Sequence, residues 1–415
     1  MAKFTKKNVD ATELIDPVFY AAANCNRAIE KYGKENVINA TIGTLYDEDN
    51  NLVALKTVYG TYDSIDAKEK AAYAKSFAGN PDFRRQSYKW VTRGSDINLC
   101  HGVCATPGGT GAISATFSSV LDNGDTIVLP NIAWGSYWTM SQTNNFKTAE
   151  YRMFDGDSFN IKSFKETCEK VMEKQGKVLA LINDPCHNPT GYSMTNDEWS
   201  QVIDVVNELS EKGPFVLVDD IAYIDFSYDL ENSRKYMDNF NKLGKNALIV
   251  VCFSTSKTLT SYGLRCGAAV AMAREEESVK EFLSLCEKTA RSVWSCIPNA
   301  AMENFVKVTT EKYDEFMAEK QYYVDLVKQR SDIFKKEADE CGLPYYPYKE
   351  GFFVTVRLPD NETCEKYQQA LFDANIFGVR CDKGIRMAVC SLPIRHTIGL
   401  AAKMKKILDE TMQKA

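Results

Sequence analysis

Five short apolar runs, each separated from the next by turn residues and longer amphipathic stretches, constrain the fold of this chain more than any other feature. The runs are near-continuous in Val, Ile, Leu, Ala and Phe, which is typical of strands that are covered on both faces. They span residues 126–129, 178–182, 215–218, 247–253 and 268–273. Strands that alternate with helices predict an α/β domain with a largely parallel sheet.

Helical patterns fill the intervals between these runs. The stretch that starts at Ala112 places its apolar residues on one helical face and ends at the turn residues 122–125. Residues 197–209 and 275–292 show the same pattern. The chain therefore repeats strand and helix through its middle portion.

The C-terminal third changes character. Charged helical stretches near residues 311–340 lead to a strand-like run at 352–356 and a last helix from about Ile398. A second, smaller α+β domain is expected there. We expect a large domain over residues 56–320, a discontinuous small domain over 17–55 and 321–415, and an N-terminal arm over 1–16.

Composition excludes several classes of protein. A net charge of −6 and a pI of about 5.4 argue against a nucleic-acid surface, which is usually basic. No apolar run approaches the roughly 20 residues of a membrane helix, and residues 1–8 lack the apolar core of a signal peptide. Thirteen scattered cysteines fit a reducing compartment. We expect a cytoplasmic protein without a membrane or nucleic-acid partner.

Polar and aromatic side chains follow the predicted strands at the point where each strand ends. In an open α/β sheet that edge is where ligands bind, because loops and helix N-termini converge there. The residues at this edge are Trp134, Asn188, Asp220, Tyr223, Ser254, Ser256 and Lys257. Their arrival at one edge predicts a binding site.

The segment Ser254-Thr255-Ser256-Lys257, with Arg265 eight residues later, is suited to a phosphate group. Two hydroxyls, an ammonium and a guanidinium can hold a phosphate dianion through charge-assisted hydrogen bonds. The alternative is a surface loop with a solvated lysine. Because Lys257 follows an apolar strand, a buried functional lysine is favoured.

A glycine-rich segment at residues 106–112 opens the helix described above. Gly109 and Thr110 at a helix N-terminus offer free N–H groups to an anion. The segment lacks the third glycine of the dinucleotide fingerprint and the Gly-Lys-Ser/Thr of a Walker loop. A phosphate monoester fits better, although an ordinary helix cap is nearly as compatible with the pattern.

Asp220 could be a metal ligand, a helix cap or the partner of a cationic ring nitrogen. A metal site is not expected, because the chain has only three histidines and the cysteines around His101 lack a second pair at zinc spacing. A lysine, a phosphate cup, a carboxylate, a tyrosine, an asparagine and a tryptophan together are the residues needed to bind pyridoxal 5′-phosphate.

Three blocks of sequence carry a resemblance to a known family. They are Asn188-Pro189-Thr190-Gly191, Asp220-Ile221-Ala222-Tyr223, and Ser254-Thr255-Ser256-Lys257 with Arg265-Cys266-Gly267. With them, the chain resembles the class I aminotransferases, the aspartate and aromatic branch of the fold-type I pyridoxal phosphate enzymes, from Ile38 to Met387. The resemblance implies a mostly parallel seven-stranded sheet sandwiched by helices, and a homodimer with shared active sites.

The resemblance also implies a role for each matching residue. Lys257 forms the Schiff base and carries the proton, Asp220 pairs with the ring nitrogen, and Tyr223 and Asn188 bind the ring oxygen. Trp134 stacks on the ring, Arg386 binds the substrate α-carboxylate, and Gly43 lies where the backbone closes over the substrate. The phosphate is held by Gly109, Thr110, Ser254, Ser256 and Arg265, and by Tyr73 of the neighbouring subunit, for which Tyr62 is an alternative.

Two positions bear on substrate choice and tuning. Arg291 resembles the family's arginine that crosses the dimer interface to bind a distal carboxylate, and a helix-end surface arginine is the equal alternative. Tyr137 stands where much of the family has a histidine behind the aspartate.

The resemblance implies ping-pong transamination between an L-amino acid, dicarboxylic or aromatic, and a 2-oxo acid. The main alternative is a C–S β-lyase that uses the same lysine and cofactor. A cofactor-binding regulator is a further alternative, but such chains normally carry a basic helix-turn-helix extension, and none precedes Gly43.

Overall fold

The computed structural model describes residues 4–6 and 9–413. Its largest element is a seven-stranded sheet with the strand order β2-β10-β9-β8-β7-β3-β4. The pairs β4–β3, β3–β7, β7–β8 and β8–β9 are parallel, and β10 runs antiparallel to both β9 and β2. The strands span Cys100–Thr106 (β2), Thr126–Pro130 (β3), Lys147–Tyr151 (β4), Val178–Asn183 (β7), Phe215–Asp220 (β8), Ala247–Ser254 (β9) and Gly267–Ala273 (β10). The predicted mostly parallel, seven-stranded α/β sheet is confirmed.

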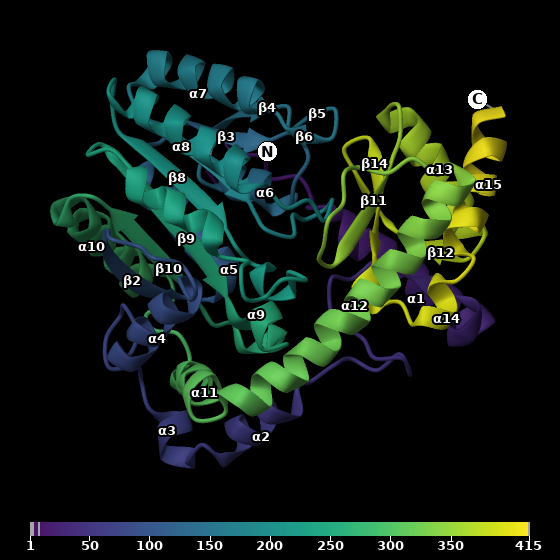
Figure 1. The fold of residues 1–415 in the computed structure, drawn as a ribbon, viewed down its shortest axis with the longest axis horizontal. Helices are drawn as coiled ribbons and strands as arrows, with labels where there is room; N and C mark the ends of the chain where they lie inside the picture. The colour runs from purple at the N-terminus through teal and green to yellow at the C-terminus, as the bar shows by residue number, and fades with distance from the viewer. Residues whose placement is uncertain (1–3, 7–8, 414–415) are drawn as a thin grey trace.

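Helices cover both faces of this sheet (Figure 1). On one face α7 and α8 contact the central strands, and α4 contacts β2 and β10; on the other face lie α5 and α10. Successive residues of β7 alternate between the two hydrophobic clusters, with Ala180 in one and Leu181 in the other. Burial on both faces explains why the central strands have no polar alternation. The helices span Pro81–Val91 (α4), Gly108–Val120 (α5), Ser136–Thr143 (α6), Ile161–Gln175 (α7), Asn196–Ser210 (α8), Glu276–Val293 (α10) and Asn299–Thr310 (α11).

All five predicted apolar runs are strands, with ends that differ by at most two residues. The helix expected from Ala112 begins four residues earlier, at Gly108. Strands β2 and β4 have no counterpart among the apolar runs. They are the two edge strands, and most residues of β4 are partly or fully exposed, so their sequences need not be continuously apolar.

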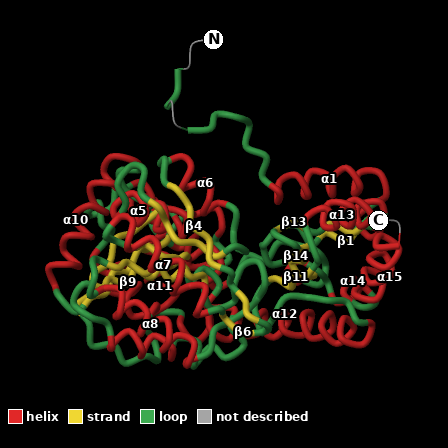
Figure 2. The backbone as a smooth tube through the Cα atoms, turned by 90° about the horizontal axis from the view of Figure 1, so that it is seen from above, coloured by secondary structure: helices red, strands yellow, loops and turns green. Residues whose placement is uncertain are grey.

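A smaller body lies beside the large sheet (Figures 1 and 2). It contains the three-stranded antiparallel sheet β11-β14-β13 and a parallel pair of β1 with β12. The N-terminal helix α1 packs on β12 and β13, at the other end of the chain. Its elements are Pro17–Tyr32 (α1), Ile38–Asn39 (β1), Phe353–Arg357 (β11), Asn361–Asp373 (α13), Ile376–Phe377 (β12), Val379–Cys381 (β13), Gly384–Ala388 (β14), Ile394–Thr397 (α14) and Leu400–Gln413 (α15).

One long helix, α12 (Tyr313–Cys341), joins the two bodies. It contacts α2 and α11 near one end and α14 and α15 near the other, and Figure 1 shows it crossing between them. Short elements complete the chain: Lys56–Ser64 (α2), Ala67–Ala71 (α3), Phe154–Asp155 (β5), Ser158–Phe159 (β6) and Thr255–Thr258 (α9). The expected domain boundaries at residues 55/56 and 320/321 stay predictions. Of the expected N-terminal arm, residues 1–3 and 7–8 lie outside the described part of the chain.

Candidate active site

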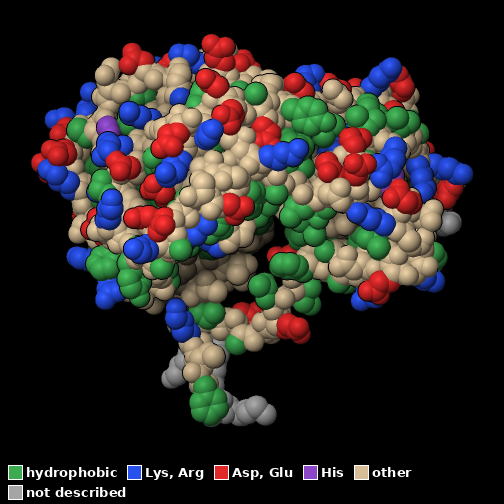
Figure 3. Space-filling view, turned by 90° about the horizontal axis from the view of Figure 1, so that it is seen from below, with side chains coloured by type: hydrophobic (Ala, Val, Ile, Leu, Met, Phe, Trp, Pro, Cys, Tyr) green, Lys and Arg blue, Asp and Glu red, His purple; other side chains and the backbone are tan. Residues whose placement is uncertain are grey.

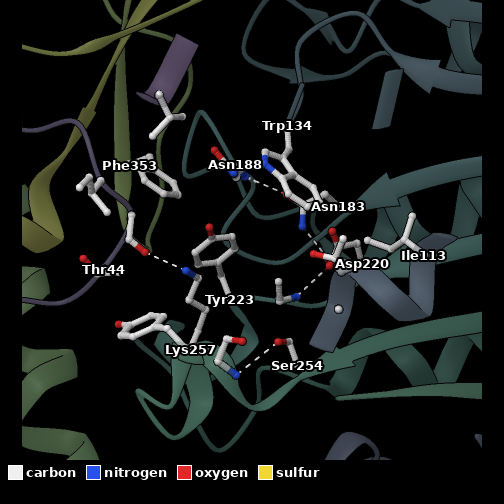
Figure 4. A pocket seen from close by; sticks show the side chains of 18 of the residues that line it. Thr44, Ile113, Trp134, Asn183, Asn188, Asp220, Tyr223, Ser254, Lys257 and Phe353 are labelled. Carbon is white, nitrogen blue, oxygen red and sulfur yellow. Dashed lines mark hydrogen bonds between the residues drawn. The ribbon is translucent and has the colours of Figure 1, made fainter. Parts of the chain in front are cut away.

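The carboxyl ends of the parallel strands open onto a cavity of about 310 Å³ (Figure 4). On the face of the molecule shown in Figure 3, the surface is hollowed between the two bodies. Strand β9 leads to Ser254, Ser256 and Lys257, and β8 leads to Asp220 and Tyr223. Further residues of the cavity wall come from the smaller body. Of the residues predicted for the site, the cavity wall contains Gly43, Gly109, Thr110, Trp134, Asn188, Asp220, Tyr223, Ser254, Ser256, Lys257, Arg265 and Arg386.

Lys257 projects into this cavity from the four-residue helix α9. Its Nζ donates a hydrogen bond to the carbonyl oxygen of Gly43 at 2.8 Å. The same nitrogen lies 4.7 Å from the ring centroid of Tyr262 and 5.5 Å from that of Tyr223. Burial lowers the pKa of Lys257 from 10.5 to about 8. A substantial fraction of the amine is therefore neutral and nucleophilic near neutral pH.

Asp220 is buried at the end of β8, with its carboxylate held by two donors. The hydroxyl of Tyr137 donates to Oδ2 at 2.5 Å, and the backbone N–H of Ala222 donates to Oδ1 at 3.1 Å. Burial raises the pKa of Asp220 to about 6, and both donors oppose that rise because they stabilise the ionised form. Asp220 can therefore be an anion at neutral pH and attract a cation from the cavity.

Arg386 reaches the cavity from β14 and is itself buried. Its Nη1 donates to Oδ1 of Asn188 at 3.1 Å, and its Nη2 donates to the carbonyl oxygen of Thr41 at 2.7 Å. The Phe353 ring lies 4.3 Å from the guanidinium carbon. The Arg386 Nε is buried and has no hydrogen-bond partner among the described residues. A buried guanidinium with a free donor and no carboxylate ion pair in the described chain is suited to bind an anion from solution.

A second anion-binding group lies on the opposite wall, where α5 begins. Gly109 and Thr110 lie in the first turn of α5, where backbone N–H groups are free to bind an anion. They line the same cavity as Ser254, Ser256 and Arg265. A Cβ at Gly109 would lie 3.3 Å from Cβ of Ser254, and one at Gly108 would lie 2.8 Å from Nη2 of Arg265. The glycines therefore let the backbone approach these side chains closely.

Three predicted residues are not in the cavity of this chain. Tyr73 is 86% exposed, and Tyr62 instead lies beneath the ammonium of Lys70, with 5.0 Å to the ring centroid. Arg291 is exposed, donates to Oγ of Ser295 at 3.0 Å and lies 5.0 Å from the Phe77 ring centroid. Their roles across a subunit interface stay predictions.

Several residues of the cavity wall carried no signal in the sequence. Val18, Ile42 and Thr44 come from the N-terminal fifty residues, and Phe353 comes from β11. They reach the site only through the packing of the smaller body. Tyr262 lies inside the loop between Lys257 and Arg265, and its hydroxyl accepts a hydrogen bond from the backbone N–H of Leu45 at 3.0 Å. That position between two predicted ligands could have suggested it.

The sequence led us to expect neither a metal site nor a membrane helix. Within residues 4–6 and 9–413, no group of three or more His, Cys, Asp or Glu side chains is placed to hold a metal ion. In the same part of the chain, no helix is long and apolar enough to cross a membrane.

Comparison with known proteins decides the family. A model of the family "Aminotransferase class I and II" matches residues 35–405. The chain belongs to that family. The aspartate aminotransferase of Salmonella typhi is 27% identical over 288 residues, covering 68% of this chain and 70% of the relative. A crystal structure of an aminotransferase from Anaerococcus prevotii is 32% identical, with a TM-score of 0.93 over 99% of this chain and 100% of the other. An aromatic-amino-acid aminotransferase from Burkholderia pseudomallei, covalently bound to pyridoxal phosphate, is 19% identical, with a TM-score of 0.77 over 96% and 98% of the two chains.

The protein is thus an amino-acid aminotransferase, as the resemblance implied. Its substrates are small molecules, namely amino acids and 2-oxo acids, and the β-lyase alternative is not favoured. The matched range 35–405 contains every cavity residue named above except Val18. In this aminotransferase, the amine of Lys257 and the guanidinium of Arg386 therefore belong to the matched region.

Proposed function

We propose that this aminotransferase binds pyridoxal 5′-phosphate at the sheet edge and transfers the amino group of an aspartate-like or aromatic L-amino acid to a 2-oxo acid. One observation carries the proposal. The buried amine of Lys257, the carboxylate of Asp220 and two separate anion-binding groups all face one cavity. The names of the relatives, aspartate and aromatic-amino-acid aminotransferases, support this substrate range.

The residues present fit this cofactor. The cradle at Gly108 and Gly109 has no room for a Cβ on the first glycine, and its donors are two hydroxyls, a guanidinium and a helix N-terminus. Such a donor set suits a phosphate dianion. Asp220 lies across the cavity as the partner for a protonated ring nitrogen. Trp134 also lines the cavity and packs edge-on against Tyr137, with 5.5 Å between the ring centroids.

When bound, the cofactor supplies an aldehyde carbon that condenses with amines and a protonated ring that withdraws electrons from the substrate Cα. The chain supplies the other functions. Arg386 binds the α-carboxylate, held in place by Asn188 and the carbonyl oxygen of Thr41. Lys257, once its amine is free, would remove the Cα proton as a general base and deliver it to the carbon that comes from the cofactor's aldehyde group. The backbone at Gly43 and the Phe353 ring line the cavity from the side of the smaller body.

A panel of half-reactions tests the substrate range. Cofactor-loaded protein is mixed with one amino acid at a time, without a 2-oxo acid, and the cofactor absorbance is followed. We expect aspartate, glutamate, phenylalanine or tyrosine to convert the cofactor to its amine form in one turnover. Alanine should react more slowly, because it lacks both a distal carboxylate and an aromatic ring. Continuous release of pyruvate from cystathionine in the absence of a 2-oxo acid would contradict the proposal.

The Tyr137 hydroxyl has a testable effect on Asp220. Tyr137→Phe removes a donor to a buried carboxylate, so the pKa of Asp220 should rise. We expect the acid limb of the half-reaction's pH profile to move upward by about one pH unit. Tyr236→Phe is the matched control, since Tyr236 donates at 2.7 Å to the neighbouring buried Asp219. Equal acid limbs in wild type and Tyr137→Phe would rule out this role.

We further propose a cytoplasmic homodimer in which Tyr73 and Arg291 serve the neighbouring subunit's site. The exposure of Tyr73 and of Val293, which is 72% exposed beside Arg291, supports an interface there. All thirteen cysteines are free thiols, which is compatible with a reducing compartment. Sedimentation should give a dimer for the wild type, and a monomer that retains full activity would contradict the shared site.

A further inference from the structure

A fully buried lysine side chain lies against the backbone of Lys257. Lys320, on α12, is 1% exposed, although lysine is rarely buried to this extent. Its Nζ donates to the backbone carbonyl oxygens of Lys257 at 3.2 Å and Thr258 at 3.1 Å. The same nitrogen lies 3.5 Å from the ring centroid of Phe226. Lys320 therefore contacts the backbone of the proposed Schiff-base residue without reaching the cavity wall.

Lys320 belongs to a buried cluster of ionisable groups around Asp225; burial lowers the pKa of Lys320 to about 7, and the Asp225 carboxylate opposes that fall. The Asp225 carboxylate pairs with Arg93 at 3.0 Å and Arg234 at 2.5 Å. It also accepts hydrogen bonds from the Thr258 hydroxyl at 2.6 Å and the Trp90 indole at 2.9 Å. Burial would raise the pKa of Asp225, but Arg234 and Arg93 hold it far below its usual range. Asp225 therefore keeps its two arginine partners if Lys320 is replaced.

The cluster fixes the short helix that carries Lys257. Helix α9 has only four residues, so few of its carbonyl groups have partners within the helix. The Lys257 carbonyl also accepts a hydrogen bond from the backbone N–H of Thr260, at the long distance of 3.3 Å. The two bonds from Lys320 and the Thr258–Asp225 bond therefore add side-chain constraints to the backbone bonds of this turn, such as that from the Leu259 N–H to the Thr255 carbonyl oxygen at 2.8 Å.

The same long helix also holds the loop that meets the other end of the Lys257 side chain. Arg330 on α12 is fully buried and donates to the carbonyl oxygens of Tyr46 at 2.9 Å and Cys390 at 2.8 Å. Three residues before Tyr46, the carbonyl oxygen of Gly43 accepts the hydrogen bond from Lys257 Nζ. Helix α12 thus binds the backbone of Lys257 through Lys320. Through Arg330 it also binds the loop of residues 43–46, whose Gly43 carbonyl accepts the hydrogen bond from the Lys257 amine.

We propose that Lys320 is a positioning residue for the aminotransferase reaction, which sets the orientation of Lys257 by binding its backbone to α12. The proposal rests on the proposed function of Lys257. Lys320 does not touch substrate or cofactor, because its three N–H groups face two carbonyl oxygens and a phenyl ring inside the protein. Its effect on the reaction is exerted through the backbone of Lys257.

Lys320→Met tests this inference, since methionine keeps an unbranched side chain of similar length and removes the three donors. We expect amide hydrogen exchange in the segment 254–261 to become about tenfold faster, because the turn loses two hydrogen bonds from a buried side chain. We expect kcat to fall by a similar factor and KM to change less than twofold, because Arg386 and the anion cradle remain. Lys328→Met is the matched control: Lys328 lies on the same helix, half-exposed, and pairs with Asp332 at 2.6 Å. It should leave both measurements unchanged.

A second variant covers the case in which Lys320→Met does not fold. Lys320→Gln keeps two N–H donors on an uncharged side chain. If both variants fold, exchange in 254–261 should increase less in Lys320→Gln than in Lys320→Met. If only Lys320→Gln folds, its exchange should still be faster than that of wild type. Wild-type exchange in 254–261 together with wild-type kcat in either folded variant would overturn the inference. The exchange measurement on the cofactor-free chain is independent of the proposed function. If wild type fails to attach pyridoxal phosphate, the proposed function fails, whereas unchanged exchange in the variants contradicts only the role of Lys320.

Discussion

Replacing Lys257 with alanine should abolish transamination while leaving a folded protein. Among the described residues, Lys257 carries the only amine in the wall of this cavity, and we propose it both for the covalent attachment and as the general base. Loss of a positioned general base alone costs about 10²–10⁴-fold in rate, and the loss of the covalent route adds to this. We expect turnover to fall by at least about 10⁴-fold, and borohydride reduction to attach no cofactor to the variant.

The variant's stability separates chemistry from folding. Burial lowers the pKa of Lys257 to about 8, below the 10.5 of an exposed lysine, so the protonated amine destabilises the folded chain relative to the unfolded one. This destabilisation is complete below pH 8 and is lost as the pH rises toward 10.5. The cofactor-free variant should therefore unfold at a temperature no more than slightly below that of wild type. In wild type, cofactor attachment should accelerate as the pH rises toward 8, because the neutral fraction of the amine increases. Lys336→Ala, at an exposed lysine on α12, is the control. Near-normal turnover in Lys257→Ala would refute the assignment.

The central part of the fold could be predicted because its strands are buried on both faces. Strands β3, β7, β8, β9 and β10 are buried along their whole length and apolar over most of it, so each appears in the sequence as a continuous run. The edge strands β2 and β4 are covered less completely, and their polar and charged residues hide them. The same burial argument predicted most of the site, since residues that follow such strands must meet at one edge of the sheet.

The rest of the site depends on contacts that no local pattern encodes. Arg386 is separated by 345 residues from Thr41, whose carbonyl oxygen it binds, and only its family motif revealed it. Val18 and Phe353 enter the cavity because the smaller body packs against the large sheet. Lys320 lies in a charged helical stretch where a lysine normally faces solvent, so its burial could not be inferred. Tyr73 and Arg291 need a second subunit and stay predictions.

Asp220→Asn should produce the second large loss. Asparagine keeps the shape of the side chain but cannot carry the negative charge that keeps a bound ring nitrogen protonated. Without that charge the ring withdraws electrons poorly, and removal of the substrate Cα proton becomes slow. We expect the variant to bind pyridoxal phosphate, because the cradle at Ser254, Ser256 and Arg265 is intact. The half-reaction should slow by at least about 10³-fold, equivalent to roughly 4 kcal/mol of transition-state stabilisation.

The adjacent residue provides a closely matched control. Asp219 is as buried as Asp220 but points to the other face of β8, where the Tyr236 hydroxyl donates to its Oδ2 at 2.7 Å. Its Oδ1 has no hydrogen-bond partner within the described residues, and burial raises its pKa well above the usual range. Asp219→Asn makes the same substitution at a carboxyl group outside the cavity wall and should react at close to the wild-type rate. If the two variants slowed the half-reaction equally, the effect would come from the packing of β8, and the charge of Asp220 would have no specific role.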